Sequence, residues 1–284
     1  MMKVLVTGVT GQLGHDCVEE LQRRGIECRG VSSKDFSLTD AAKAREVVTA
    51  YAPDVVMHCA AWTAVDKAES ERETCEEVNA GGTRIMAEIC RDLGAKMIYI
   101  STDYVFPGTG TEPWQTDSPK APCNAYGASK LHGEQAVQEL LDQYFIVRIS
   151  WVFGINGKNF IRTMLRLSEN HDKLTVVDDQ VGSPTYTRDL AVLLADMAAS
   201  DKYGVYHATN EGYCSWAEFA AEIFRQAGKA TVVEPVPSTA YPTPAVRPKN
   251  SRMSKAGLDA AGFHCLPAWQ DAVGRYLQEL SNEG

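Results

Sequence analysis

The sequence has no Cys-x-x-Cys pair and no matching pair of histidines, although its 284 residues include eight cysteines. Their dispersed spacing argues against a structural zinc site and against a disulfide framework. We therefore expect reduced thiols in a cytoplasmic protein, most of them serving as small buried hydrophobic side chains.

Long apolar runs and an excess of basic residues are also absent. No stretch approaches 18 apolar residues, and the apolar start at residues 1–6 turns polar at Thr7 and Gly8, so we expect neither a membrane span nor a signal peptide. The net charge of −9 argues against nonspecific binding to nucleic acid or to an anionic membrane surface. Any bound phosphate must therefore be met by local donors and a few placed Arg or Lys side chains.

The first half of the chain alternates short β-rich runs with helical patterns. Such alternation predicts an α/β fold with a doubly wound parallel (Rossmann) sheet. The expected strands are 3–7, 26–31, 53–58, 96–101 and 145–149, and the expected helices are 17–24, 41–51, 72–93 and one that follows residue 124.

The alternation becomes irregular after residue 150. We expect helices at 159–168, 188–199 and 215–227, strands at 174–177 and 204–208, and an ordered Pro-rich loop at 237–248. These elements predict a dinucleotide-binding domain of residues 1–155 plus roughly 186–203. Residues 156–185 and 204–284 would form a smaller C-terminal lobe over the carboxyl edge of the sheet, where such folds bind ligands.

A glycine-rich loop follows the first expected strand. Its spacing is Gly8-x-x-Gly11-x-x-Gly14, one residue longer at the first gap than the common dinucleotide fingerprint. Glycine permits the tight turn and the close approach of the backbone to a pyrophosphate. The second strand ends in Ser32-Ser33-Lys34 instead of an acidic residue, which favours tolerance of NADPH over strict use of NADH.

Tyr126 and Lys130 lie four residues apart in a predicted helix and therefore on one of its faces. A cation close to a phenol favours the phenolate, so Tyr126 could exchange a proton nearer neutral pH. Chance alone could produce this spacing. Two other features give it weight, namely the glycine loop and the hydroxyls of Ser101 and Thr102 at the end of a central strand, where they could bind a substrate carbonyl.

With these residues in place, the chain resembles the extended short-chain dehydrogenase/reductase family over essentially its whole length. The stretches that carry the resemblance are 7–14, 60–69, 101–108, 126–130, 150–153, 159–160, 179–185 and 247–251. Residues 7–14 and 126–130 are typical of the whole superfamily. Residues 60–69, 179–185 and 247–251 resemble its nucleotide-sugar reductases in particular.

The resemblance implies reduction of the C4 keto group of dTDP-4-dehydro-L-rhamnose with NADPH or NADH, giving dTDP-L-rhamnose for cell-wall polysaccharide. It assigns catalysis to Tyr126 as general acid, to Lys130, which holds the nicotinamide ribose and lowers the pKa of Tyr126, and to Thr102. Besides Tyr126 and Lys130, the implied cofactor contacts are Gly8, Gly11, Gln12, Leu13, Gly14, Asp35, Phe36, Ala61, Trp62 and Thr63. The implied substrate contacts are Thr102, Asp103, Tyr104, Trp151, Asn159 and Arg247.

Other readings stay open at this point. Some relatives bind magnesium at a dimer interface through acidic side chains; here the first helix has His15-Asp16, and we predict no metal, while a homodimer is compatible with the resemblance. An epimerase or dehydratase of the same fold is an alternative, although Thr102-Asp103-Tyr104 lacks the Asp-Glu pair usual in dehydratases. A non-catalytic regulatory subunit of methionine adenosyltransferase is a third reading, against which the intact Thr102, Tyr126 and Lys130 argue.

Overall fold

The computed structural model describes residues 2–282, so Met1 and the last two residues of the predicted lobe lie outside the described part. A six-stranded sheet forms its centre, in the order β10-β5-β4-β3-β1-β2, and all neighbouring strands are parallel. The strands are β1 (Lys3–Thr7), β2 (Glu27–Val31), β3 (Val55–His58), β4 (Lys96–Thr102), β5 (Tyr144–Ile149) and β10 (Gly204–His207).

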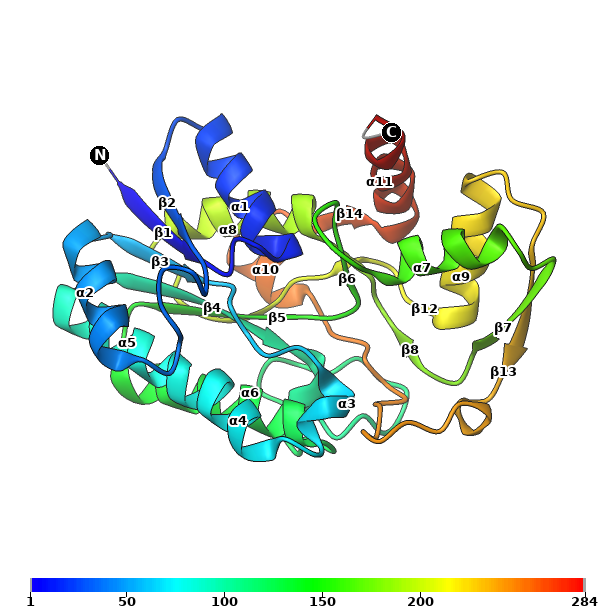
Figure 1. The fold of residues 1–284 in the computed structure, drawn as a ribbon, viewed down its shortest axis with the longest axis horizontal. Coiled ribbons are helices and arrows are strands. Elements are labelled where there is room, and N and C mark those ends of the chain that lie inside the picture. The colour runs from blue at the N-terminus through cyan, green and yellow to red at the C-terminus, as the bar shows by residue number, and fades with distance from the viewer. Residues whose placement is uncertain (1, 283–284) are drawn as a thin grey trace.

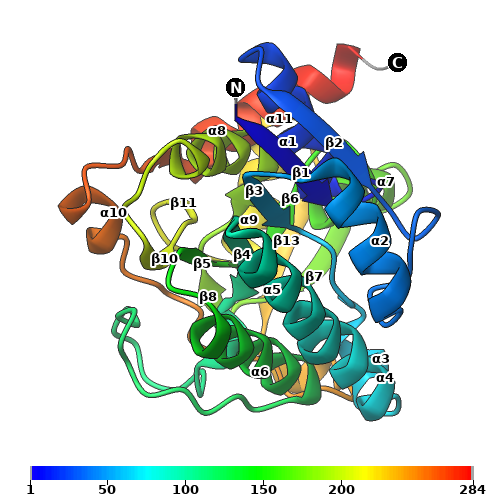
Figure 2. The ribbon, with the colours of Figure 1, turned by 90° about the vertical axis from the view of Figure 1, so that its left-hand side faces the viewer.

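Helices cover both faces of this sheet (Figures 1 and 2). Apolar side chains of α1 (Gln12–Arg23) and α8 (Thr187–Ala198) pack on one face. Those of α2 (Ala41–Tyr51), α5 (Gly82–Leu93) and α6 (Ala125–Leu140) pack on the other. The predicted doubly wound α/β fold is confirmed.

The expected single helix at 72–93 is interrupted. The segment comprises α4 (Arg72–Glu76), a π-helical turn η1 (Glu77–Gly81) and α5. Asn79 in this turn is buried, and its side chain contacts both Trp62 and Ser129, linking the loop after β3 to α6. Since π-turns keep a nearly helical periodicity, the sequence pattern did not reveal this one.

A smaller lobe stands beside the carboxyl edge of the sheet and has its own apolar core. In it, α7 (Phe160–Ser168) and α9 (Trp216–Gln226) pack beside the parallel pair β7 (Lys173–Val177) and β13 (Val232–Val236), and α11 (Trp269–Asn282) packs against α9. The shorter elements are α3 (Val65–Ala68), α10 (Ala256–Ala260), β6 (Val152–Phe153), β8 (Val181–Gly182), β9 (Thr185–Tyr186), β11 (Asn210–Glu211), β12 (Cys214–Ser215), β14 (Leu266–Ala268) and the 3₁₀ turns η2 (Asp103–Val105) and η3 (Ser238–Ala240).

The division into two functional domains stays a prediction. One predicted boundary, at residue 204, assigns a strand of the central sheet to the lobe. Residues 204–207, which we grouped with the lobe, form β10 and pair in parallel with β5. The physical reason is that Tyr206 and Ala208 bury their side chains in the core beneath α8. None of the helices in residues 2–282 is long and apolar enough to cross a membrane.

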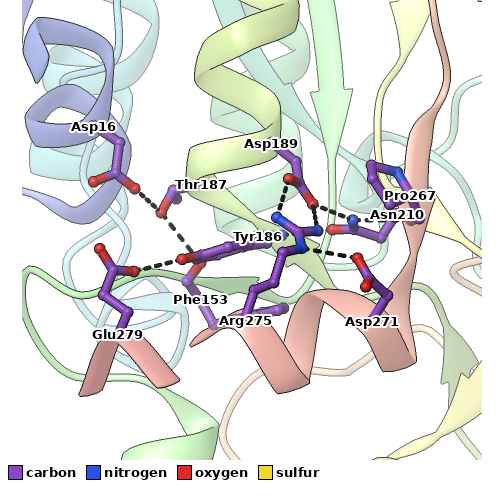
Figure 3. Close-up of polar contacts among 10 residues, drawn as sticks. All are labelled: Asp16, Phe153, Tyr186, Thr187, Asp189, Asn210, Pro267, Asp271, Arg275 and Glu279. Carbon is purple, nitrogen blue, oxygen red and sulfur yellow. Dashed lines mark hydrogen bonds and ion pairs between the residues drawn. The ribbon is translucent and has the colours of Figure 1, made fainter. Parts of the chain in front are cut away.

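Polar side chains fasten the lobe to the sheet domain (Figure 3). Arg275 of α11 donates to both carboxylate oxygens of Asp189 on α8, at 2.6 and 2.7 Å. Thr187 at the start of α8 donates to Asp16 of α1, and Tyr186 donates to Glu279 of α11. Three helices from distant parts of the chain are therefore joined at one place.

Candidate active site

A cavity of about 890 Å³ opens at the carboxyl ends of β1, β3, β4 and β5. Such an edge is where open α/β sheets bind ligands. Most of the predicted site residues line it: Gly8, Gly11, Gln12, Leu13, Gly14, Phe36, Ala61, Thr63, Thr102, Asp103, Tyr104, Tyr126, Lys130 and Trp151. Four do not: Asp35, Trp62, Asn159 and Arg247.

The glycine loop brings the start of α1 against the cavity. Gly8 has φ +73°, and a Cβ there would lie 2.8 Å from the backbone of Ala60. A Cβ on Gly14 would lie 2.4 Å from the carbonyl oxygen of Gly8. No side chain caps the N-terminus of α1 and its first turn has no acidic residue, so the first N–H groups suit an anion. These residues fit the pyrophosphate of a dinucleotide.

The far end of the cavity has hydroxyls where a dinucleotide would place its adenosine ribose. Ser32 and Ser33 line this end, and no carboxylate does. Asp35 accepts hydrogen bonds from the backbone N–H and the hydroxyl of Ser32, at 2.9 and 3.3 Å, so it stabilises the turn after β2. Trp62 donates its backbone N–H to Asn79 and its indole N–H to Ala64. Asp35 and Trp62 do not line the cavity, and their contacts with the cofactor stay predictions.

The predicted catalytic side chains meet in the middle of the cavity. Asn124 caps the N-terminus of α6 by accepting from Gly127 N, and this helix presents Tyr126 and Lys130 on one face. Thr102 ends β4, where its hydroxyl donates to Asp103 Oδ1 at 3.0 Å and lies close enough to Tyr126 to influence the pKa of the phenol. A hydroxyl, a phenol and an amine from two elements thus face one space.

Burial governs the protonation of these groups. It raises the pKa of Tyr126, and the neighbouring Asp103 raises it further, whereas the Thr102 hydroxyl opposes both effects. Burial lowers the pKa of Lys130 to about 7, partly offset by Glu134. Lys130 is not among the groups that dominate the pKa of Tyr126, so the expectation that Lys130 lowers this pKa stays a prediction. Tyr126 is a protonated phenol at neutral pH, the form that a general acid needs.

A buried ion pair lies behind the catalytic residues and was not predicted. Arg148 on β5 binds both carboxylate oxygens of Glu134 on α6, at 2.8 and 2.7 Å, and both side chains are almost fully buried. Ser101, which precedes Thr102, donates to the same carboxylate at 2.5 Å. Glu134 lies one helical turn after Lys130 on α6. The ion pair of Glu134 with Arg148 therefore fixes α6 against β4 and β5 directly beneath the site.

An aromatic wall forms the side of the cavity that faces the lobe. The rings of Trp151 and Trp216 stack with centroids 3.7 Å apart, and Phe160 and Phe219 extend the surface. Trp151 has φ +51°, a left-handed conformation that costs a non-glycine residue roughly 1 kcal/mol. Trp216 was missed in the sequence, although the capping box of Ser215 and Glu218 marks the helix start that presents it.

The lobe's predicted polar contacts lie at the margin of the cavity or beyond it. Asn159 is a buried cap of α7: its amide oxygen accepts from Arg162 N, and its amide nitrogen donates to Gln12, Gly154 and Tyr276. Its contact with the substrate stays a prediction. Lys158, one residue earlier, lines the cavity and was missed, because a lone lysine beside glycine has no distinctive pattern.

Arg247 lies next to the cavity wall without lining it. Its guanidinium donates to Asp66 at 2.7 Å and to the hydroxyl of Tyr104 at 3.4 Å. Since Tyr104 does line the cavity, Arg247 is one residue removed from it. Its predicted contact with a diphosphate stays a prediction.

Comparisons with known proteins agree on one family. The model of the RmlD substrate binding domain matches residues 2–282. A dTDP-4-dehydrorhamnose reductase of Streptomyces griseus is 43% identical over 276 residues, covering 95% of this chain and 91% of that protein. A dTDP-4-keto-6-deoxy-D-glucose reductase of Streptomyces niveus is 38% identical, covering 95% and 94%.

Among solved structures, a dTDP-4-dehydrorhamnose reductase of Bacillus anthracis in complex with NADP superposes with a TM-score of 0.95 at 41% identity. The match covers 98% of this chain and 100% of that one. The cavity with its glycine loop, Thr102, Tyr126 and Lys130 therefore lies in a fold shared over the full length of these proteins. The chain belongs to the RmlD substrate binding domain family, within the extended short-chain dehydrogenases/reductases.

Proposed function

We propose that this protein is an NADPH- or NADH-dependent oxidoreductase that reduces the C4 keto group of dTDP-4-dehydro-L-rhamnose to give dTDP-L-rhamnose. The observation that carries the proposal is the single cavity in which an anion-binding glycine loop, a protonated Tyr126 and an aromatic wall meet. The reductases of Streptomyces griseus and Bacillus anthracis support the substrate and the cofactor.

When bound, the dinucleotide supplies the hydride for the ketone. The glycine loop and the start of α1 would hold its pyrophosphate, and Ser32 and Ser33 can accommodate a 2′-phosphate or a 2′-hydroxyl. Lys130 would hold the nicotinamide ribose through its amine. The absence of a carboxylate among the side chains that line this end of the cavity supports NADPH over strict NADH.

The chain's own part in the reaction is proton delivery and orientation. Tyr126 would donate its phenolic proton to the C4 oxygen as negative charge develops there. Thr102 would hydrogen-bond the same oxygen and fix its position between the two hydroxyls. Trp151, backed by Trp216, would pack on the hexose and exclude water from it.

The polar ends of the substrate would meet the cations at the edge of the cavity. Lys158 lines it, and Arg247 would reach the diphosphate because a guanidinium matches two phosphate oxygens at once. We place the enzyme in the cytoplasm, with a small nucleotide sugar as its partner and a homodimer as its assembly. It belongs to the biosynthesis of rhamnose for cell-wall polysaccharide.

A second candidate is a reductase for a related dTDP-4-keto-6-deoxyhexose, favoured by the relative from Streptomyces niveus. Incubation of the purified protein with NADPH and each of the two 4-keto sugars separates these functions. We expect stoichiometric NADPH oxidation with dTDP-4-dehydro-L-rhamnose and at least tenfold slower turnover with the D-gluco ketone. An epimerase would convert the sugar without net oxidation of NADPH, and a regulatory subunit would convert neither.

A further inference from the structure

Asn124 connects two parts of the molecule that are far apart in sequence. Its Oδ1 accepts from Gly127 N at 2.8 Å, which caps α6, and its Nδ2 donates to the carbonyl oxygen of Val246 at 2.8 Å. The side chain is only 7% exposed. Because one partner is a donor and the other an acceptor, the orientation of the amide is unambiguous.

The segment that Asn124 reaches is the part of the Pro-rich loop that carries Arg247. Asp66 on α3 holds the same segment from another side: it accepts from Arg247 at 2.7 Å and from the backbone N–H of Ala245 at 3.3 Å. Figure 1 shows this loop passing beside α3. One turn after Asp66, Glu69 accepts from Ala125 N at 2.8 Å, at the first residue of α6. Three segments thus meet at one junction, formed by Asp66, Glu69, Asn124 and residues 245–247.

The junction lies between the predicted diphosphate contact and the reacting group. Arg247 donates to the hydroxyl of Tyr104, and the Tyr104 ring meets that of Tyr126 edge-on, with centroids 5.7 Å apart. Gly127 allows this approach, since a Cβ there would lie 2.3 Å from the carbonyl oxygen of Tyr104. Asn124 itself precedes Tyr126 by two residues. These contacts therefore connect the loop to the helix turn that carries the phenol.

A cap alone does not require an amide at this position. Asn, Asp and Ser cap helices about equally well, because a cap needs only an acceptor for an N–H group. The side-chain N–H donor of Asn124 is not needed for the cap, and it is hydrogen-bonded to the carbonyl oxygen of Val246.

We propose that Asn124 is a positioning residue that fixes the Arg247 loop against the N-terminus of α6, so that Arg247 and Tyr126 act on one nucleotide sugar at a set separation. This proposal rests on the proposed function, because it takes the ligand of the loop to be the nucleoside diphosphate.

The test is Asn124→Asp, which keeps the shape and the cap and removes the donor to Val246. We expect the KM for the nucleotide sugar and the Kd for dTDP, measured by calorimetry, each to rise about tenfold. The Kd for NADPH should match that of the wild type, since the glycine loop is untouched, whereas the Tm should fall because the buried carboxylate faces the carbonyl oxygen of Val246. Asn124→Ser, which adds no charge, should shift both constants in the same direction.

A double-mutant cycle with Arg247→Ala shows whether the effect passes through the loop. In that background Asn124→Asp should change the Kd for dTDP less than about twofold, because the contact that Asn124 positions is already lost. Equal effects of Asn124→Asp in both backgrounds would overturn the proposal. So would a wild-type KM and dTDP affinity in Asn124→Asp, or a fall in Tm alone.

Failure of the proposed function would look different. In that case the wild type itself would not oxidise NADPH with the 4-keto sugar, whereas the binding of dTDP still reports on the junction.

Discussion

At the scale of single residues, Tyr126 is both buried and exposed to the cavity on one side. Burial raises its pKa, so it is protonated at neutral pH, and it lines the cavity together with Thr102. A phenol in this state can donate a proton but is a poor nucleophile. The structure therefore favours acid catalysis over covalent catalysis.

Replacement of Tyr126 by Phe tests that role. We expect kcat for ketone reduction to fall at least about 100-fold, the usual scale for loss of a general acid. The Kd for NADPH, measured by fluorescence quenching, should change little because the glycine loop and Lys130 remain. A variant that keeps more than about a third of the wild-type kcat would remove Tyr126 from the proposed mechanism.

At the scale of elements, the pair of Glu134 and Arg148 determines how α6 sits on β4 and β5. Arg148→Met would leave the Glu134 carboxylate buried without its cation. We expect this variant to lose about 3–5 kcal/mol of unfolding free energy in urea, the range for breaking a buried pair. The double variant Glu134→Gln, Arg148→Met should lose clearly less, and equal losses in the two variants would show that the pair is not coupled.

Asp16 joins α1 to α8 and gives a pH-dependent contribution to stability (Figure 3). Burial raises the pKa of Asp16 to about 6, from about 3.8 for an unburied carboxyl, and the nearby Glu279 adds to this rise. The hydrogen bond from Thr187 opposes the rise, and the charges of His15 and Arg188 oppose it more weakly. Between pH 3.8 and about pH 6, Asp16 is ionised in the unfolded chain but still protonated in the folded one. The free energy of unfolding therefore falls as the pH rises through this range, and it stays lower above pH 6.

Asp16→Asn should remove that fall. The variant can still accept from Thr187, so its stability relative to wild type should increase on the order of 2 kcal/mol from pH 4 to pH 6.5. Thermal unfolding across this range measures the difference, with the exposed Asp172→Asn as control. A difference that is independent of pH would mean that Asp16 ionises alike in both states.

Local pattern accounts for which elements were predictable. Apolar strand runs and helix periodicity depend on neighbours in sequence. The succession of strands and helices along the sheet domain could therefore be predicted from them. The start of α1 was placed too late, because Gly11 caps it without a side chain. The position of Arg247 depends on a contact that no local pattern encodes, because Asp66 and Arg247 are 181 residues apart. Asp35 and Asn159, in contrast, make local contacts with residues three positions away, namely Ser32 and Arg162.

At the scale of the whole molecule, two parts of the chain line the cavity. The sheet domain contributes the glycine loop, Thr102, Tyr126 and Lys130, and the aromatic wall draws Trp216 and Phe219 from the lobe. The contacts of α11 with α8 and of Asn124 with Val246 hold these parts together at opposite sides of the cavity. The chemistry and the recognition of the sugar are thus contributed by different segments.

The central claim is that this cavity delivers a hydride to C4 of the sugar while Tyr126 delivers the proton. It is tested most directly with NADPH deuterated at the transferable position of the nicotinamide and dTDP-4-dehydro-L-rhamnose, followed by mass spectrometry and NMR of the product. We predict dTDP-L-rhamnose with a single deuterium at C4, in amounts equal to the NADPH oxidised. Product without deuterium at C4, or no oxidation of NADPH by the wild-type protein, would contradict the account.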